Sequence, residues 1–513
     1  MNKSSFILST ILLSSINIII RSLGFIYKIF LSKLIGATGI GLYQMVFPFL
    51  MLMISISTAG IPVGVSKLVA KEKSLHNEDG VYKTLLIALS IGGIISLSLS
   101  IFVSLKINYI VNNILKNPIL YYPVLWTIPA ISLITFSSIL RGFFYGIKEM
   151  STPAISQIIE QICRIGFALL LLYYKKPSNS ILAATIAIIG ISIGEFFGLV
   201  FLFLKFSFSN KNTSFVILKN SRYNCVNIFK DLLYISFPIT LNNIISVTMQ
   251  TLNSILIPQR LQLSGYSAIS AIEVFGKISG MAMSLLFLPF TVTNALVVNI
   301  IPNISEALAL KDWKELNSKS NLALKITLLI SIPISIAYTV FGKHISMLIY
   351  GQEDIGRYLS ILSYGIIFQC LQHTSSGILQ GLGKQVIVTI NSFLGAILQL
   401  YCIYFLMANP IYGINGYFIG FLLSVLLVFI LNFIILFRYI SLNLSFIYYI
   451  FSPIFASIIM VLSMIYSYKT AFYIINHNLW SSIIATFTGF ILYIILLFLT
   501  KTLDLKHIKN TFK

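Results

Sequence analysis

Long apolar runs separated by short polar segments make up most of this chain. No Asp, Glu, Lys or Arg occurs in the 53 residues between Lys384 and Arg438, or in the 28 residues between Asp231 and Arg260. At a rise of about 1.5 Å per residue, 28 helical residues span about 42 Å, more than the roughly 30 Å hydrocarbon core of a bilayer. The runs are apolar on every face and lack the alternation of barrel strands. The pattern therefore predicts membrane-spanning helices.

Hydropathy predicts about fourteen such helices, and hence an all-α polytopic membrane protein. Because the predicted number of spans is even, both termini are expected on the same side of the membrane. The expected spans are residues 6–30, 40–66, 83–105, 119–141, 152–174, 180–204, 232–257, 268–300, 325–350, 358–380, 386–408, 411–437, 446–468 and 478–500.

The positive charges of the chain indicate its orientation. The chain has 35 Lys and Arg against 14 Asp and Glu, a net charge of +21. Its basic residues lie in short loops between apolar runs and form no basic domain, so we expect no nucleic-acid partner. Of the 35, 22 fall in tails and loops on the side of the termini, 10 on the other side and three within helices. The positive-inside rule then predicts a multi-pass protein of the cell membrane with both termini in the cytoplasm.

Three pairs of similar segments indicate an internal duplication. "GIPVGVSKLVA" (60–70) is echoed by "IIPNISEALA" (300–309), which places Pro62 and Pro302 240 residues apart. "ILRG" (139–142) is echoed by "ILQG" (378–381), and "KTLLIALSI" (83–91) by "KITLLISIP" (325–333). The offsets are nearly the same, and each pair falls on helices of the same predicted direction. The echoes therefore predict two parallel six-helix repeats, related by an axis along the membrane normal.

The duplication divides the chain into four predicted parts. Residues 1–205 form a first six-helix bundle, 206–230 a basic cytoplasmic linker, 231–440 a second bundle, and 441–513 two extra helices with a basic cytoplasmic tail. Two pseudo-symmetric bundles are typical of alternating-access transporters. A membrane scaffold without transport activity is the alternative, although it needs neither a duplication nor buried charge.

Charged residues inside the predicted spans are the candidate functional residues. Each costs about 2.5–3.5 kcal/mol at the centre of a membrane helix, so its presence needs a reason. If they face inward, the resulting cavity is net cationic, and it suits an anion such as the pyrophosphate of a polyprenyl-linked sugar. The candidates for substrate binding are Arg21, Lys28, Arg164 and Lys277, and those for ion coupling are Glu160, Glu195 and Glu273.

Most of these residues also have a structural interpretation. Lys28 can extend its ammonium group to the outer interface. Glu160 and Arg164 are spaced i, i+4 and can form a self-neutralising ion pair. Glu195 fits a packing role or a cation site equally well. Arg21 has no acidic residue near it in its own helix and lies too deep to reach the interface easily, so it is the strongest substrate-binding candidate.

Two further charged positions also have a structural interpretation. Lys277 has Glu273 four residues before it, which favours an ion pair within that helix. Arg141 ends the fourth predicted span and is expected at the cytoplasmic surface, where it orients the helix.

Enzymatic chemistry has no support in the sequence. There is no phosphate-binding loop, no cluster of His and Cys with metal spacing, and no nucleophile paired with a base. The four cysteines show no spacing for a metal or redox site. We therefore expect neither an enzyme nor a bound cofactor or metal.

Several segments together resemble the multidrug/oligosaccharidyl-lipid/polysaccharide exporter superfamily, and more closely its stage V sporulation protein B branch. They are "RSLGFIYKIFLSKLIGATGIGLYQMVFPFLML" (21–52), "GIPVGVSKLVAKEK" (60–73), "LRGFFYGIKEMSTPAISQIIEQICR" (140–164) and "FGKISGMAMSLLFLPFTVTNALVVNIIP" (275–302). The resemblance extends over nearly the whole chain. It implies fourteen helices, a V-shaped pair of six-helix bundles, and export of lipid-linked glycans, including lipid II for the peptidoglycan of the spore cortex.

The related lipid II flippases hold pyrophosphate with arginines in a central cavity. Their first-helix pattern matches Arg21 and the following Leu-Gly-Phe, and their eighth-helix arginine falls at Lys277. Their second arginine falls at Tyr27, with Lys28 one place later. Their charged cluster in the second helix falls within residues 54–59, which are uncharged here. The resemblance thus implies a basic triad of Arg21, Lys277 and Lys28 rather than three arginines.

These observations together predict a flippase that moves a lipid-linked anionic glycan precursor to the outer leaflet by alternating access. Its expected partners are the polyprenyl-pyrophosphate-linked substrate, membrane lipids and cell-wall synthesis proteins. A drug/cation antiporter of the same fold is the alternative. That activity calls for an acidic residue in the first or seventh helix, and neither predicted span contains one.

Overall fold

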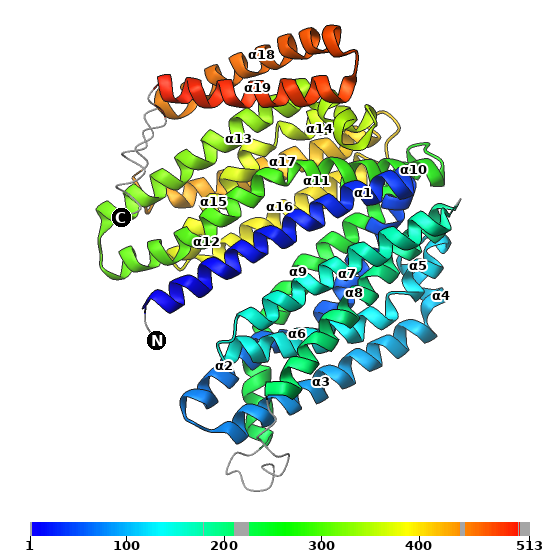
Figure 1. Ribbon diagram of the computed structural model, residues 1–513, viewed down its shortest axis with the longest axis vertical. Coiled ribbons are helices and arrows are strands. Elements are labelled where there is room, and N and C mark those ends of the chain that lie inside the picture. The colour runs from blue at the N-terminus through cyan, green and yellow to red at the C-terminus, as the bar shows by residue number, and fades with distance from the viewer. Residues whose placement is uncertain (1–2, 178, 210–224, 442–446, 501, 503–513) are drawn as a thin grey trace. The chain divides into compact units, whose positions relative to one another are not determined.

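The structure is a computed structural model of the 513-residue chain. It describes residues 3–177, 179–209, 225–441, 447–500 and 502, without the side chains of 3–18, 209, 225, 238–239, 241–242 and 447–448. Every regular element among the described residues is a helix (Figure 1). Part of the predicted basic linker (210–224) and most of the predicted basic tail (503–513) lie outside the described residues.

The chain divides into two compact units, of which the first comprises residues 1–259 and 268–276. Within it, α7 and α8 pack along each other, and α6 packs against α2, α3 and α8. Its elements are α1 (Lys3–Thr58), α2 (Ile61–Ser74), α3 (Glu78–Leu105), α4 (Ile107–Tyr109), the π-helix η1 (Ile110–Ile114), the 3₁₀ turn η2 (Pro118–Leu120), α5 (Tyr121–Leu125), α6 (Ile128–Gly146), α7 (Ser151–Lys175), α8 (Ser180–Ser209), most of α9 (Cys225–Leu263) and α10 (Ala268–Phe275).

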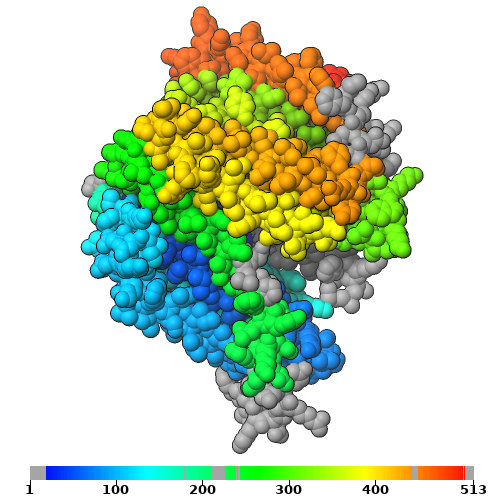
Figure 2. Space-filling model, turned by 180° about the vertical axis from the view of Figure 1, so that it is seen from behind, coloured from blue at the N-terminus to red at the C-terminus, as the bar shows by residue number. Residues whose placement is uncertain are grey.

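The second unit comprises residues 260–267 and 277–513. The last two helices, α18 and α19, lie side by side (Figure 1), and α16 and α17 pack together on the face seen in Figure 2, where they are yellow to orange. Its elements are most of the π-helix η4 (Gly276–Ala282), α11 (Met283–Leu286), α12 (Leu288–Ala309), α13 (Trp313–Tyr350), α14 (Asp354–Ser363), α15 (Ile366–Gly381), α16 (Gln385–Phe405), α17 (Ile414–Leu436), the π-helix η5 (Ile447–Phe451), α18 (Ser452–Ile475) and α19 (Asn478–Leu499).

Packing groups the helices differently from the predicted sequence boundaries. Most of α9, which contains the seventh predicted span, belongs to the first unit, and the division between the units falls within η4. The boundaries predicted at residues 205, 230 and 440 describe the duplication, and they stay a prediction.

The described residues contain 12 helices long and apolar enough to cross a membrane. The first two predicted spans form one continuous element that includes α1, and the eighth is divided at Phe287 into two candidate spans. The tenth predicted span is broken into α14, of 10 residues, and α15, of 16 residues, each below the length of a span. The chain is therefore an all-α polytopic membrane protein, and the count of fourteen stays a prediction.

A single glycine bends the first long helix. Gly36 has φ 68° and ψ 179°, which breaks the helical path between the first two predicted spans. A side chain with a Cβ rarely adopts this positive φ, whereas glycine adopts it at little cost. The expected loop between the two spans is thus reduced to a local kink at one residue.

The surface of the molecule is rich in large apolar side chains. Ile94, Leu97 and Ile101 on α3 are 53–68% exposed, and Val386 on α16 is 72% exposed. In water such surfaces would drive association, whereas in a bilayer they face acyl chains. The exposed apolar side chains are therefore the lipid-facing surface of a membrane protein.

The repeated "ILxG" segments make corresponding contacts in the two units. A Cβ added to Gly142 on α6 would lie 2.4 Å from the carbonyl oxygen of Pro62 on α2. A Cβ added to Gly381 on α15 would lie 2.8 Å from the Cβ of Ile304 on α12, two residues after Pro302. In each unit, the glycine of the "ILxG" segment thus allows its helix to approach closely the helix that carries the echoed proline segment. This shared contact supports the predicted duplication.

Candidate functional site

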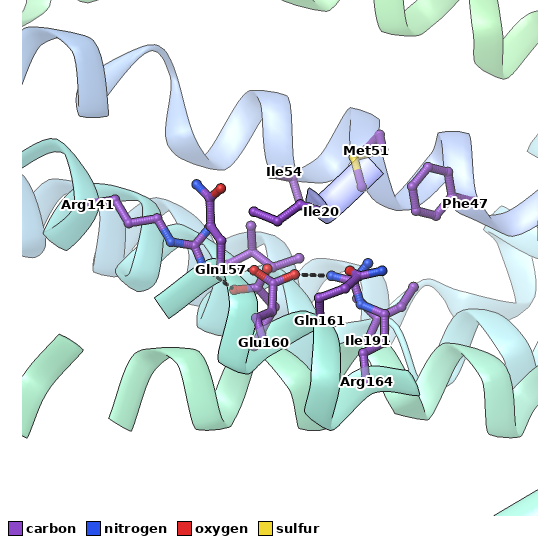
Figure 3. Close-up of a pocket in the computed structure, with 12 residues that line it drawn as sticks. Ile20, Phe47, Met51, Ile54, Arg141, Gln157, Glu160, Gln161, Arg164 and Ile191 are labelled. Atoms are coloured by element: carbon purple, nitrogen blue, oxygen red, sulfur yellow. Dashed lines mark hydrogen bonds and ion pairs between the residues drawn. The ribbon is translucent and has the colours of Figure 1, made fainter. Parts of the chain in front are cut away.

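A cavity of about 300 Å³ lies inside the first unit, between α1, α6, α7 and α8. The lining residues of α1 are all apolar and lie together in Figure 3, whereas α6, α7 and α8 contribute four charged side chains, two glutamines and two isoleucines. The lining residues are Ile20, Phe47, Met51, Ile54, Ile134, Arg141, Gln157, Glu160, Gln161, Arg164, Ile191 and Glu195.

Close packing of α7 and α8 places the acidic residues of this site. Gly190, Gly194 and Gly198 are spaced four residues apart and lie along one stripe of α8. A Cβ added to Gly194 would lie 2.6 Å from the backbone oxygen of Glu160, and one added to Gly198 would lie 3.3 Å from the Cβ of Glu160. Small residues at this spacing let membrane helices approach closely. Glu195, next to Gly194, is thereby brought beside α7.

Glu160 on α7 is held between two guanidinium groups. Arg141 Nη2, from α6, donates to Glu160 Oε2 at 2.9 Å. Arg164 Nη2, one turn along α7, donates to the other oxygen, Oε1. Figure 3 shows the two arginine side chains reaching Glu160 from opposite sides. One carboxylate thus holds two arginines next to each other at the wall of the cavity.

Glu195 on α8 completes this charged cluster with weaker contacts. Its Oε2 accepts a hydrogen bond from Ser137 Oγ at 2.8 Å, and Arg141 Nη2 lies 3.5 Å away. Charge-assisted hydrogen bonds are normally about 2.7–2.9 Å long, so the second contact is a loose one. Arg141 is therefore shared unequally between Glu160 and Glu195.

All four charged side chains of the cluster are largely shielded. The exposed fractions are 6% for Glu195, 10% for Glu160, 13% for Arg141 and 19% for Arg164. The Nε atoms of both arginines are buried and have no hydrogen-bond partner. Because a buried donor without an acceptor is unfavourable, both arginines carry an unsatisfied donor in this arrangement.

The cluster is electrically balanced, with two arginines and two glutamates. This cavity therefore differs from the cationic one that the sequence predicts. Of the four residues expected to bind substrate, Arg164 lines it, whereas α1 contributes apolar side chains. Arg21 is an exposed residue and Lys28 a half-buried one, and neither is among the lining residues.

The second unit holds the remaining basic candidate. Lys277 lies in η4, and its Nζ donates to Asp354 Oδ2 at the start of α14, at 3.1 Å. Glu273, the partner that the sequence suggests for Lys277, is a half-buried residue of α10. The lysine side chain is 13% exposed and the aspartate 73%. Asp354 was missed because it lies 77 residues away in the chain, where helical spacing is no guide.

No metal centre is found among the described residues, since no three of their His, Cys, Asp or Glu side chains come together. The described cysteines Cys163, Cys370 and Cys402 are free thiols.

Comparison with known proteins agrees with the all-helical fold. The model of the family described as "Polysaccharide biosynthesis protein" matches residues 7–308. The chain belongs to this family. A second family model, MatE, matches residues 238–405. These matches place the chain in the multidrug/oligosaccharidyl-lipid/polysaccharide exporter superfamily, as the sequence predicted.

Two proteins of Bacillus subtilis are among the relatives of this chain. It is 27% identical over 416 residues to the stage V sporulation protein B, covering 81% of this chain and 80% of that relative. It is 26% identical over 430 residues to the lipid II flippase MurJ, covering 78% of this chain and 76% of the relative. A solved inward closed structure of a lipid II flippase MurJ aligns with a TM-score of 0.69 at 18% identity, covering 95% of this chain and 98% of that one.

These likenesses establish the fold and the general class. The chain is a multi-pass membrane protein of the flippase and exporter class, and it is not an enzyme. The expectations of an all-α membrane fold and of a transporter are thus confirmed.

Arg141 is the site residue that sequence reasoning missed. We expected it at the cytoplasmic surface, which is wrong, because its side chain is 13% exposed and paired with two acids. Its own helix has no acidic residue, so no spacing rule gives it a partner. The one available signal was Ser137, four residues earlier on the same face, which contacts the same Glu195.

Proposed function

We propose that this protein is a flippase that moves a lipid-linked anionic glycan precursor from the cytoplasmic to the outer leaflet of the cell membrane. The names of its relatives support this, since one is a lipid II flippase and another a sporulation protein. Lipid II or a related precursor of cell-wall or spore-cortex peptidoglycan is the proposed substrate.

The observation that carries the proposal is the pair of guanidinium groups at the wall of the cavity in the first unit. Arg141 and Arg164 stand on either side of Glu160, and each retains a buried Nε donor without a partner. Guanidinium groups bind phosphate oxygens through paired donors and stay charged at any physiological pH. A cavity of about 300 Å³ is at the small end of ligand sites, which suits a pyrophosphate group with its glycan and lipid parts outside.

The further residues assigned to transport are part of the same proposal. Arg21, Lys28 and Lys277 supply positive charge along the path of the head group, and Glu160, Glu195 and Glu273 are the candidates for ion coupling. The two duplicated bundles rock against each other so that the substrate path opens to each side in turn. Both termini lie in the cytoplasm, and cell-wall synthesis proteins are the proposed partners at the membrane.

Transport in proteoliposomes tests the proposal directly. Purified protein is reconstituted with lipid II, and the fraction that reaches the outer leaflet is measured with an enzyme that modifies only exposed lipid II. The unchanged protein is expected to accelerate flipping, and Arg164→Ala to reduce it at least about 30-fold, since a lost charge-assisted contact costs about 2–3 kcal/mol. Arg438→Ala, at an exposed arginine of the second unit, is the matched control and should retain the rate. Flipping no faster than in protein-free vesicles contradicts the proposal.

A drug/cation antiporter is the second candidate, and one observation favours it. Glu160 and Glu195 both line the cavity, and buried carboxylates are what a cationic substrate or coupling ion requires. The same vesicles distinguish the two functions when they are loaded with a fluorescent cationic dye and given a pH gradient. Gradient-driven dye movement that is lost in Glu160→Gln, without flipping of lipid II, would replace the flippase proposal.

A further inference from the structure

The four charges of the cavity are balanced in number but unequal in their contacts. Glu160 accepts hydrogen bonds from two guanidinium groups, one on each oxygen. Glu195 accepts one from Ser137 at 2.8 Å and has Arg141 at 3.5 Å. Neutralising Glu195 therefore weakens fewer strong hydrogen bonds than neutralising Glu160.

The balance of charge opposes binding of an anion in the structure as it stands. A phosphate group entering the cavity would add negative charge to a shielded cluster that has no net charge, and unpaired buried charge is costly. If Glu195 takes up a proton, the same cluster carries one net positive charge. Its protonated carboxyl can donate to Ser137 Oγ, since a hydroxyl both donates and accepts.

Arg141 transmits this change to the ligand. With Glu195 neutral, α8 no longer presents a negative charge to the guanidinium group of Arg141, which keeps its contact of 2.9 Å with Glu160. The guanidinium groups of Arg141 and Arg164, which both line the cavity, then carry the net positive charge. Gln157 and Gln161 line the same cavity and offer neutral amide donors beside the pair.

We propose that Glu195 is a proton-binding residue which, through Arg141, converts the neutral cavity of the first unit into a binding site for a phosphate or pyrophosphate group. The family match assigns no role to Arg141, and it does not identify the coupling ion. The identity of the physiological ligand rests on the proposed function. The linkage between proton binding and anion binding rests on the geometry alone. Because the two ligands favour each other, binding of the anion takes up a proton.

Several other charged or titratable groups surround Glu195, and each is a possible competitor for the proton. α6 contributes Arg141, and α7 contributes Glu160 and Arg164, all of which interact electrostatically with Glu195. α5 carries no charged residue. From α1, the hydroxyl groups of Tyr27 and Tyr43 interact with Arg164. Among the described residues that line the cavity, Glu160 is the other carboxylate, and it is the competing assignment that the experiment has to address.

Calorimetry in two buffers of different ionisation enthalpy measures the protons taken up when an anion binds. Sulfate is the probe, because it keeps two negative charges across the range studied and takes up no proton itself. The purified full-length protein is expected to take up about one proton per sulfate. Its affinity for sulfate should therefore rise about tenfold for each unit by which the pH is lowered. Glu195→Gln should bind sulfate without proton uptake, with an affinity that no longer depends on pH. Arg141→Gln should weaken sulfate binding at least about tenfold at every pH.

Three results would overturn the inference: no proton uptake by the unchanged protein, unaltered uptake in Glu195→Gln, or uptake that disappears in Glu160→Gln alone. Sulfate binding by Glu195→Gln itself shows that the variant is folded. Glu315→Gln is the matched control, because this glutamate forms an i, i+4 pair with Lys319 and is 43% exposed, outside the cavity. It should retain the proton uptake of the unchanged protein.

Two further ligands separate this inference from the proposed function. Inorganic pyrophosphate in solution and a polyprenyl diphosphate in lipid nanodiscs are titrated with the unchanged protein and with Arg141→Gln. Tight binding of both, weakened in the variant, supports the site and the lipid-linked substrate. Binding of pyrophosphate alone supports the proton-linked anion site but contradicts the flippase proposal. Binding of neither, together with no binding of sulfate, overturns the site.

Discussion

The close approach of α8 to α7 at Gly194 can be tested by adding one methyl group. In Gly194→Ala the new Cβ would lie 2.6 Å from the carbonyl oxygen of Glu160, 2.9 Å from the Cβ of Arg164 and 3.2 Å from its backbone nitrogen. Ordinary contacts of a Cβ begin near 3.4 Å, so the first distance has to grow by about 0.8 Å. Two of these three atoms belong to the backbone of α7 and cannot move aside by a change of rotamer.

The expected cost follows from a comparison within the same helix pair. Gly166 on α7 has nothing within 4 Å of an added Cβ, so Gly166→Ala adds a methyl group in open space. Both substitutions gain about 1 kcal/mol of helix propensity, which cancels in the difference between them. The remainder is the cost of overpacking, about 1–3 kcal/mol. Gly194→Ala should therefore be less stable than Gly166→Ala by that amount, with Gly198→Ala between them because its nearest contact is 3.3 Å.

Unfolding in mixed micelles by increasing fractions of a denaturing detergent measures this difference. The same three variants are then compared for flipping of lipid II in vesicles. Displacement of α8 also moves Glu195 away from Arg141, so Gly194→Ala should lose transport while Gly166→Ala retains it. Equal stability of Gly194→Ala and Gly166→Ala would refute the close packing of the two helices at the charged cluster.

Three other outcomes are expected. Arg21→Ala should abolish flipping in vesicles although the protein still inserts, whereas Lys28→Ala should be milder if its ammonium group reaches the interface; full activity of Arg21→Ala removes Arg21 from the site. A single cysteine placed at Asn179 should react with an impermeant maleimide in intact cells, and protection until the cells are permeabilised would reverse the predicted topology. Asp354→Asn should lower the free energy of unfolding by less than about 1 kcal/mol, since its side chain is 73% exposed, and a larger loss would show that its pair with Lys277 is shielded.

The membrane fold was predictable because it follows from properties of the chain that act locally. The chain contains uncharged runs of 28 and 53 residues. Because a lipid bilayer offers no hydrogen-bond partners, such runs satisfy their backbone groups by forming helices. The duplication was also visible in the sequence, and the matching contacts of Gly142 and Gly381 support it. The observed helices differ from the predicted spans where one or two residues interrupt or bend a helix. Gly36 bends α1 with a single residue, and Phe287 divides the eighth predicted span.

The candidate site was predictable only where its residues share a helix. Glu160 and Arg164 were identified as a pair because a spacing of four residues places them on one face. Sequence reasoning treated Arg141 as a surface residue and expected a cationic cavity around Arg21. The composition of the site depends instead on three helices meeting, which brings Arg141 from α6 and Glu195 from α8 to the same carboxylate.

The sequence by itself determined that these charges are buried somewhere, because a long apolar helix carries them into the membrane with it. It did not determine which charges neutralise each other. That was decided by the tertiary structure, since Gly194 allows α8 to approach within contact of Glu160 and the packing of α6 against α8 then places Arg141 between two acids. Helical spacing specifies neighbours one turn apart, whereas the partners of Glu195 lie 54 and 58 residues away in the chain and are fixed by packing alone.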